Sequence, residues 1–185
     1  NTYDLAFDIS YLLDTVGVDY SKKYVTCRQD TDLFVDVPLS ISIDPGGNIN
    51  SMTVWQYNDV KFEEKCIKEF FVKGKKDHLD LCKEFDYYYA IHRLRCSTVY
   101  LYHDAQAHKE RDKDNVRISE QIEKQLRDLG WRVVPMIPRT NNPGHDAKHT
   151  IINALLKGDI GWLPKIKVNR NQCSNLIVSI EGAET

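Results

Sequence analysis

The hydrophobic pattern changes its period near residue 77, and this change constrains the fold more than any other feature of the sequence. Before it, three short runs rich in β-branched and aromatic residues are typical of strands: LSISI at 39–43, SMTVWQY at 51–57 and CIKEFFV at 66–72. From Asp77 to His92, apolar residues recur at helical spacing. Because the links between the runs are short, the sequence predicts an antiparallel meander followed by an amphipathic helix.

Strands and helices alternate in the rest of the chain. STVYLYH at 97–103 and WRVVPMI at 131–137 are typical of strands, and each is followed by a segment with helical periodicity. Gly130 and Gly158 are suited to end these two helices. NLIVSI at 175–180 is a final apolar stretch. A meander followed by alternating strands and helices predicts an α/β fold with a mixed sheet and flanking helices.

Length and composition fit one globular domain of ordinary type. The chain has 185 residues, of which 42% are hydrophobic, enough to bury a single core. No apolar run approaches the ~20 residues that span a bilayer, and the first ten residues lack the features of a secretory signal. The five cysteines include no CxxC pair, so we expect reduced cysteines in or near the core of a cytosolic protein.

The beginning of the chain differs from the remainder. Residues 1–37 are mixed and poorly periodic, and Pro38 stands where the regular pattern begins. The sequence therefore predicts a lead-in or linker from a preceding domain over 1–37 and one domain over 38–185.

Asp44 and Asp104 each follow a predicted strand directly. An acid at the carboxyl end of a buried strand lies at the sheet edge where α/β folds place functional groups. If the two strands are parallel neighbours, the carboxylates repel each other unless a cation neutralises them. Oxygen ligands without cysteine favour Mg²⁺ or Mn²⁺ over zinc, and two such ions ~3.5–4 Å apart can promote phosphodiester hydrolysis.

Each acid also has a purely structural interpretation. Asp44 precedes Pro45, Gly46 and Gly47, which is typical of a turn in which the glycines take positive φ, and Asp104 can cap the end of its strand. A third acid, Asp146, stands where a helix N-cap is expected.

Several other polar residues accompany the acids. His103 and His145, each beside a candidate acid, are candidate supporting groups or proton carriers. Three basic residues after the second acid are candidates for contacts to DNA phosphates, although acidic residues between them are equally consistent with a solvated loop: Lys109, Arg111 and Lys113.

Three ordered segments resemble the nuclease domain of the large terminase subunit of tailed bacteriophages, the headful DNA-packaging motor. SISIDPGGNINSMTVWQ is similar to that family's first strand with its metal-binding Asp, and VYLYHDAQAH to its second acidic motif. NNPGHDAKHTIINALLKGD is similar to its Asn-Pro segment and the helix that follows. With QCSNLIVSIEGAET, the resemblance extends over about residues 39–185.

The resemblance implies a ribonuclease-H-like fold of the RuvC and integrase type. It also implies a divalent-metal-dependent endonuclease that cuts concatemeric double-stranded viral DNA with two Mg²⁺ or Mn²⁺ ions. Asp44 would then bridge both ions, Asp104 would bind one, and Asp146 is the third candidate ligand. His103, His145 and Lys148 would support the site.

The resemblance further implies partners and a location. The implied partners are double-stranded DNA, an ATPase domain of the same polypeptide, the portal protein and the small terminase subunit, with no membrane. The implied location is the cytoplasm of an infected bacterial host, transiently on the procapsid. No GxxxxGK[ST] loop is present, so no nucleotide site is expected within this chain.

The sequence departs from the family at three places. His103 replaces a glycine that usually precedes the second Asp, and Ala147 separates Asp146 from Lys148. The family commonly supplies its last acid from an Asp-Ala motif beyond the SIE stretch, and none precedes Thr185. Asp146 is therefore either the third ligand or a supporting residue.

Two other functions stay open at the level of sequence. One is a non-catalytic module that binds DNA or the portal. The other is a Holliday-junction resolvase or transposase-type nuclease, although the net charge of −2 is less basic than such proteins usually are.

Overall fold

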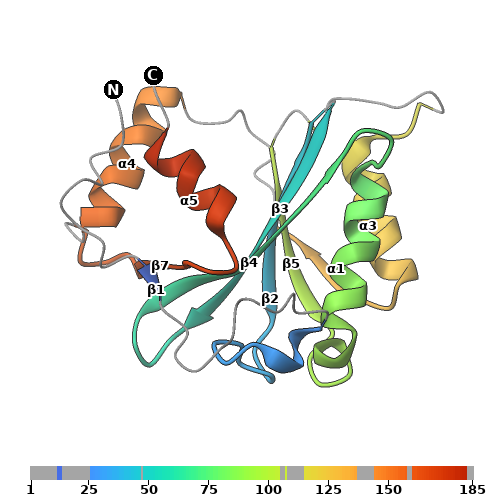
Figure 1. Ribbon diagram of the computed structural model, residues 1–185, viewed down its shortest axis with the longest axis horizontal. Helices are drawn as coiled ribbons and strands as arrows, with labels where there is room; N and C mark the ends of the chain where they lie inside the picture. Colours follow the sequence, from blue (N-terminus) through green and yellow to red (C-terminus); the bar gives the residue numbers. More distant parts are fainter. Residues whose placement is uncertain are drawn as a thin grey trace.

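A computed structural model describes residues 12–13, 26–46, 48–104, 107, 115–136, 144–157 and 160–182 (Figure 1). Among these residues, no helix is both long and apolar enough to cross a membrane. The elements in chain order are β1 Leu12–Leu13, a 3-10 helix Cys27–Gln29, β2 Leu39–Pro45, β3 Ile49–Asn58, β4 Glu63–Lys73, α1 His78–Arg93, β5 Thr98–His103, α3 Ile118–Asp128, β6 Arg132–Pro135, α4 His145–Lys157, β7 Lys165–Asn169 and α5 Ser174–Glu181.

The described strands form one mixed sheet in the order β1-β7-β4-β3-β2-β5-β6. The meander β2-β3-β4 is antiparallel, as the sequence predicts. The strands added on either side of it are parallel: β5 pairs with β2, β6 with β5, β7 with β4 and β1 with β7. The predicted mixed sheet with flanking helices is therefore confirmed.

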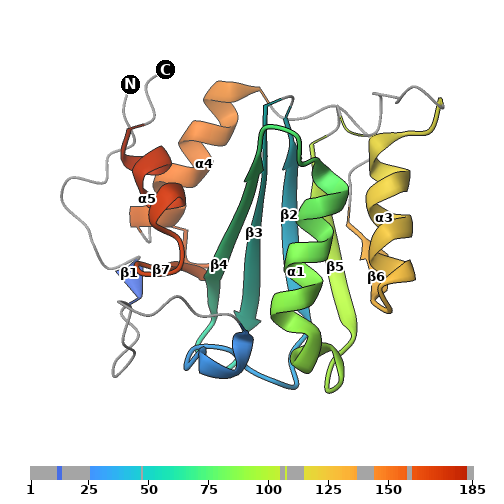
Figure 2. The same ribbon diagram turned by 45° about the vertical axis from the view of Figure 1, so that its right-hand side comes forward.

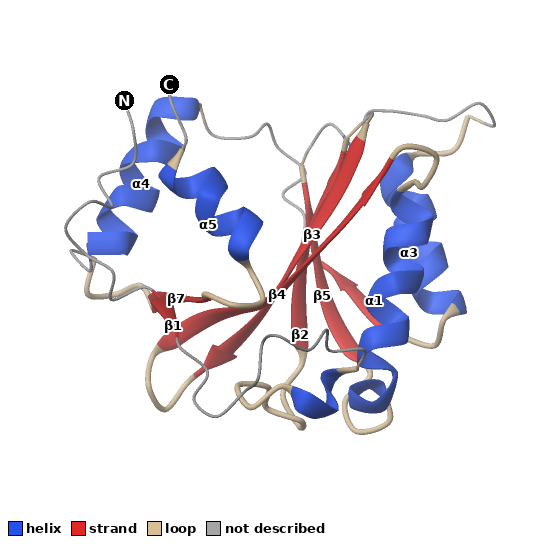
Figure 3. Cartoon of the chain, in the orientation of Figure 1, coloured by secondary structure: helices blue, strands red, loops and turns tan. Residues whose placement is uncertain are grey.

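Helices cover the two faces of the sheet unequally. α1 and α3 lie side by side on one face, whereas α4 and α5 lie on the other, beside β4 and β7 (Figures 1 and 3). The larger core lies under α1 and α3 and includes Ile41, Ile43, Phe85, Leu101 and Leu126. Full burial of one such side chain contributes about 1.5–3 kcal/mol, so this core holds β2 and β5 at the centre of the fold.

A smaller core holds α4 and α5 against the edge of the sheet. Its buried members are Cys66, Leu156, Val168, Cys173 and Ile177. None of the chain's five cysteines forms a disulfide and four are buried, which confirms the expectation of reduced cysteines in or near the core. Burial raises the pKa of the Cys66 thiol, whose Sγ lies 3.6 Å from Sγ of Cys173.

Local signals explain where the two helices on the larger core begin and end. The Asp77 carboxylate accepts hydrogen bonds from the backbone of Leu79 and Asp80, and Asp80 completes a capping box at the start of α1. Gly130 follows α3 with φ of 95°, and its N–H and that of Trp131 donate to carbonyls of the last turn. This Schellman arrangement confirms Gly130 as a helix terminator.

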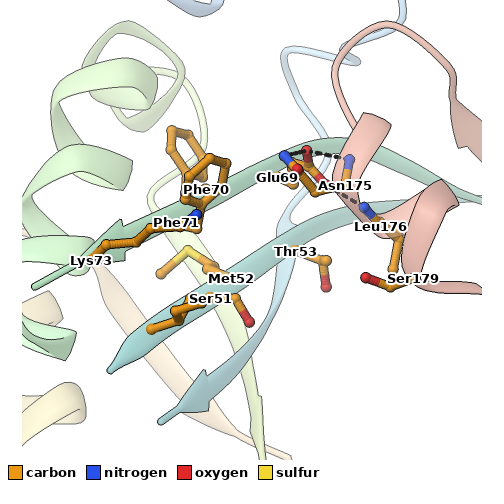
Figure 4. A pocket seen from close by; sticks show the side chains of 11 residues that line it. Ser51, Met52, Thr53, Glu69, Phe70, Phe71, Lys73, Asn175, Leu176 and Ser179 are labelled. Atoms are coloured by element: carbon orange, nitrogen blue, oxygen red, sulfur yellow. Dashed lines mark hydrogen bonds between the residues drawn. The ribbon is translucent and has the colours of Figure 1, made fainter. Parts of the chain in front are cut away.

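The carboxyl-terminal third of the structure contains two elements that the sequence pattern did not reveal. β7 was not predicted, and the apolar stretch at 175–180 forms helix α5. The Glu69 carboxylate on β4 accepts hydrogen bonds from the backbone N–H groups of Asn175 and Leu176, at 2.9 and 2.7 Å (Figure 4). A carboxylate satisfies the unpaired N–H groups and favours the dipole at a helix start, so a distant residue stabilises α5.

Residues 26–37 pack against the sheet and α1. Cys27 belongs to the larger core. The Tyr88 hydroxyl donates to the Asp30 carboxylate at 2.7 Å, and the Asn169 amide donates to the Asp32 carboxylate at the same distance. The division of the chain at residue 37 stays a prediction, but this described part of the predicted lead-in contacts the domain that follows.

Asp30 generates a prediction about the pH dependence of stability. Burial raises its pKa to about 6, against the hydrogen bond from Tyr88, whereas an unfolded Asp has a pKa of about 3.9. The folded state thus binds the proton more tightly, and stability falls as pH rises from about 4 to about 6. The free energy of unfolding of Asp30→Asn should therefore rise relative to that of the unsubstituted protein as pH increases across this window, by at most about 3 kcal/mol.

The measurement is chemical unfolding of both proteins at pH 4 and at pH 7.5. Asp128→Asn, on the exposed surface of α3, serves as the control and should show no comparable change between the two pH values. An Asp30→Asn difference that is the same at both pH values would contradict the desolvation of Asp30.

Candidate functional site

The central strands bring Asp44 and Asp104 to the same edge of the sheet. β2 and β5 are parallel neighbours, with Ile43 paired to His103. Asp44 and Asp104 are the next residues along the two strands, and backbones of adjacent strands lie about 4.8 Å apart. In Figure 2 the two strands run side by side to this edge. The two strands are therefore parallel neighbours, which is the condition under which the two carboxylates are expected to face each other.

The alternation of side chains places Asp44 on the polar face of β2. Ile41 and Ile43 are buried in the larger core, so Ser40 and Ser42 face the other side, where α4 and α5 lie. Asp44 continues this second row and is exposed. Its partner on β3 is Ser51.

The turn after Asp44 uses the backbone of this residue. The Gly46 N–H donates to the Asp44 carbonyl oxygen at 3.1 Å. Within the described part of the chain, the Asp44 carboxylate forms no hydrogen bond or ion pair. The side chain thus does not serve as the turn former that its position beside Pro45 suggests.

Gly46 is needed for a reason other than the expected one. The described glycines with positive φ are Gly74 and Gly130, so Gly46 does not use the positive φ that is open to glycine. A Cβ atom at Gly46 would instead lie 2.4 Å from the Ile49 carbonyl oxygen, which is too close for any side chain. Gly47 lies outside the described residues.

His103 supports Asp104 through the backbone. Its side chain is only 8% exposed, and Nδ1 lies 2.8 Å from the Asp104 carbonyl oxygen. Because His103 pairs with the buried Ile43, its ring lies on the core side of the sheet, opposite the row of Asp44. The contact positions Asp104 and does not place an imidazole beside both carboxylates.

Asp146 lies in the first turn of α4 and is exposed. Its prediction as an N-cap is wrong, because the Lys148 N–H donates to the Gly144 carbonyl oxygen, so the helical hydrogen bonds begin before Asp146. In Figures 1 and 2 this end of α4 lies toward the end of the molecule where β2 finishes. Lys148 is half-buried in the same turn.

The described residues do not assemble a complete set of metal ligands. Among them, no group of three or more His, Cys, Asp or Glu side chains could hold a metal ion. The donors that do come together, two carboxylates on neighbouring strands, suit Mg²⁺ or Mn²⁺, since such ions commonly use one or two carboxylates and complete their coordination with water and substrate phosphate. Outside the described residues lie the His145 side chain, Lys109, Arg111 and Lys113.

Two hollows lie on the polar face of the sheet, the face on which Asp44 lies. The first has a volume of about 400 Å³ and lies between β3, β4 and α5 (Figure 4). Ser51, the partner of Asp44, lines it together with Phe71, Lys73 and Ser179. The second has a volume of about 360 Å³ and shares Thr53 with the first.

Sequence reasoning did not identify the residues of this second hollow, which we call the trough. They come from five strands and are Ser40, Ser42, Thr53, Trp55, Glu64, Tyr102 and Ile166. The alternation in LSISI and SMTVW could have indicated some of them. In strands of this kind the apolar residues face the core, so the serine and threonine residues lie on the opposite, polar face of the sheet.

Comparisons with known proteins identify the fold. No protein-family model and no curated protein matches the sequence. The large terminase from a thermophilic bacteriophage is similar in structure, with a TM-score of 0.53 and 16% identity over 96% of this chain and 36% of that one. The P22 large terminase nuclease domain gives a TM-score of 0.52 and 12% identity, covering 80% of this chain and 69% of that one.

The nuclease domain of the human cytomegalovirus terminase, solved after soaking with Mn, gives a TM-score of 0.53 and 11% identity over 80% of this chain and 74% of that domain. At these identities the similarity shows the fold alone. The chain has the ribonuclease-H-like fold of terminase nuclease domains, as the sequence resemblance implied. It spans 36% of the length of the terminase from the thermophilic bacteriophage.

The close approach at Gly46 generates a stability prediction. Gly46→Ala forces either the turn or β3 to move, and such overpacking costs about 1–3 kcal/mol. Gly161→Ala is the matched control, because nothing lies within 4 Å of a Cβ atom there. Urea unfolding should show a clear decrease in the free energy of unfolding for Gly46→Ala and almost none for Gly161→Ala. Equal effects would mean that the turn after Asp44 is not tightly packed.

Proposed function

We propose that this chain is the metal-dependent endonuclease domain of a viral DNA-packaging terminase large subunit. It cuts concatemeric double-stranded DNA by two-metal phosphodiester hydrolysis. The observation that supports this most strongly is the register of β2 and β5, which brings Asp44 and Asp104 to one sheet edge in a fold similar to terminase nuclease domains.

In this proposal the two acids hold Mg²⁺ or Mn²⁺. Asp44 lies on a strand with neighbours on both sides and would be the ligand shared by the ions, while Asp104 would be a second ligand, from the end of β5. Bound ions of this kind lower the pKa of a water nucleophile and stabilise the leaving oxygen. The chain itself contributes rigidity, because both acids extend from strands fixed by the larger core and His103 holds the Asp104 backbone.

The remaining candidate residues have supporting roles in this proposal. Asp146 is either the third metal ligand or a supporting acid, and His145 and Lys148 lie within two residues of it in the chain. Lys109, Arg111 and Lys113 follow Asp104 closely in sequence and contact DNA phosphates.

The substrate is delivered by other parts of the packaging machine. A net charge of −2 supplies little general attraction for DNA, so an ATPase domain of the same polypeptide, the small terminase subunit and the portal protein would position the duplex. The proposed location is the cytoplasm of an infected bacterial host, transiently on the procapsid.

Plasmid nicking in Mn²⁺ tests the assignment of the two acids. Asp44→Asn and Asp104→Asn each remove a negative oxygen ligand, so cutting should fall by about 100-fold or more. Asp128→Asn, a matched change on α3, should cut at the unsubstituted rate. Thermal melting of all three variants shows whether the fold is intact. Normal cutting by Asp44→Asn would refute the proposed site.

The same assay separates the two alternative functions. A folded chain that binds DNA but never cuts it in Mg²⁺ or Mn²⁺ would be a non-catalytic DNA- or portal-binding module. A chain that cuts four-way junctions much faster than linear duplexes would be a junction-resolving nuclease.

A further inference from the structure

Glu64 is a half-buried acid without a partner in the trough. It extends from β4, and within the described residues it forms no hydrogen bond or ion pair. Burial raises the pKa of its carboxyl, and no compensating interaction lowers it. A desolvated carboxylate in a hollow of about 360 Å³ is costly to leave unpaired, which favours a ligand that donates a hydrogen bond to it.

Aromatic side chains accompany Glu64 in the trough. Tyr102 on β5 is 40% exposed and lines the trough together with Glu64. Trp55 on β3 lines the trough as well, and its indole N–H already donates to the Thr53 hydroxyl at 2.8 Å. A ligand in the trough therefore contacts aromatic rings, hydroxyl groups and the Glu64 carboxylate, an acceptor that has no hydrogen-bond donor among the described residues.

The trough lies on the same face of β2 as Asp44, farther from the end of the strand. Ser42 and Tyr102 each precede one of the two acids by two residues, a distance of about 7 Å along a strand. Successive phosphates of a DNA strand rise by about 3.4 Å. Trp55 pairs with Ser40 and Glu64 pairs with Tyr57, so Glu64 lies level with residue 38, about 20 Å along the strand from Asp44. A strand with its phosphate at Asp44 and Asp104 therefore passes Ser42 and Tyr102 first and reaches Glu64 several nucleotides farther on.

The chemistry of the trough selects a base and rejects a phosphate. A carboxylate repels a phosphate group, whereas it accepts a hydrogen bond from an exocyclic amino group, as Glu and Asp do from N4 of cytosine. Aromatic side chains stack on unpaired bases of any kind. Thymine is disfavoured, because it presents the acceptor O4 where cytosine presents an amino group.

We propose that the trough is a subsite for an unpaired nucleobase that carries an exocyclic amino group, with Glu64 as the hydrogen-bond acceptor and Tyr102 and Trp55 as the stacking surface. This inference rests on the proposed nuclease function and adds to it a preference for a base several nucleotides away from the cleaved bond. The local duplex must open for the base to enter.

Fluorescence anisotropy with single-stranded oligo(dC) and oligo(dT) of equal length tests the subsite, with Ca²⁺ as the divalent ion and at pH 8. The protein should bind oligo(dC) roughly 5- to 10-fold more tightly than oligo(dT). In Glu64→Gln the ratio should fall close to one, since an amide can donate to O4 or accept from an amino group. Glu63→Gln loses the same charge on the opposite side of β4 and should keep the ratio.

Other results would overturn the inference. Equal binding of the two oligonucleotides by the unsubstituted protein would do so, as would an unchanged ratio in Glu64→Gln. Binding of argininamide that depends on Glu64, without any base preference, would identify a basic protein partner instead. Plasmid nicking by the unsubstituted protein is measured separately. Cutting without a base preference would refute only the subsite. A base preference without cutting would refute only the proposed nuclease function.

Discussion

The parallel pairing of β2 with β5 is the constraint on which the rest of the structure depends. β2 lies inside the sheet, and its inward side chains Leu39, Ile41 and Ile43 are almost completely buried. A slip of one residue would turn these side chains to the polar face and bring Ser42 and Asp44 into the core. Burial of the three apolar residues thus fixes the register, and the register places Asp44 beside Asp104.

The two faces of the sheet have different roles because helices cover them differently. α1 and α3 seal the apolar face, while α4 and α5 pack beside β4 and β7 (Figure 3). The serine and threonine side chains of β2 and β3 consequently line hollows on the second face. Rigid strands thereby present polar groups next to the acidic pair, which is the arrangement that a site for an extended ligand requires.

The elements with strong local signals could be predicted from the sequence. The period of the hydrophobic pattern and the capping residues predict the meander and α1 with its cap at Asp77. They also predict β5, which ends just before Asp104, and β6, which begins after Gly130. The order of the elements and the resemblance of three segments to terminase nuclease domains implied the ribonuclease-H-like fold. The nearness of Asp44 and Asp104 follows once β2 and β5 are known to be parallel neighbours.

Elements that depend on distant contacts could not be predicted. The Glu69 carboxylate caps α5 from more than a hundred residues away, so the apolar pattern at 175–180 alone did not reveal a helix. β7 is short and alternates lysines with apolar residues, and it is defined by its pairing with β4. Glu64 became a candidate only when the sheet brought it into the trough with Tyr102.

The central claim is that Asp44 and Asp104 share a divalent metal site. Anomalous diffraction from a crystal of this chain soaked in Mn²⁺ tests that claim most directly. An anomalous peak is expected within bonding distance of both carboxylates at the ends of β2 and β5, and it should disappear in Asp44→Asn. Ordered Mn²⁺ bound elsewhere in the chain, with the two carboxylates unligated, would contradict it.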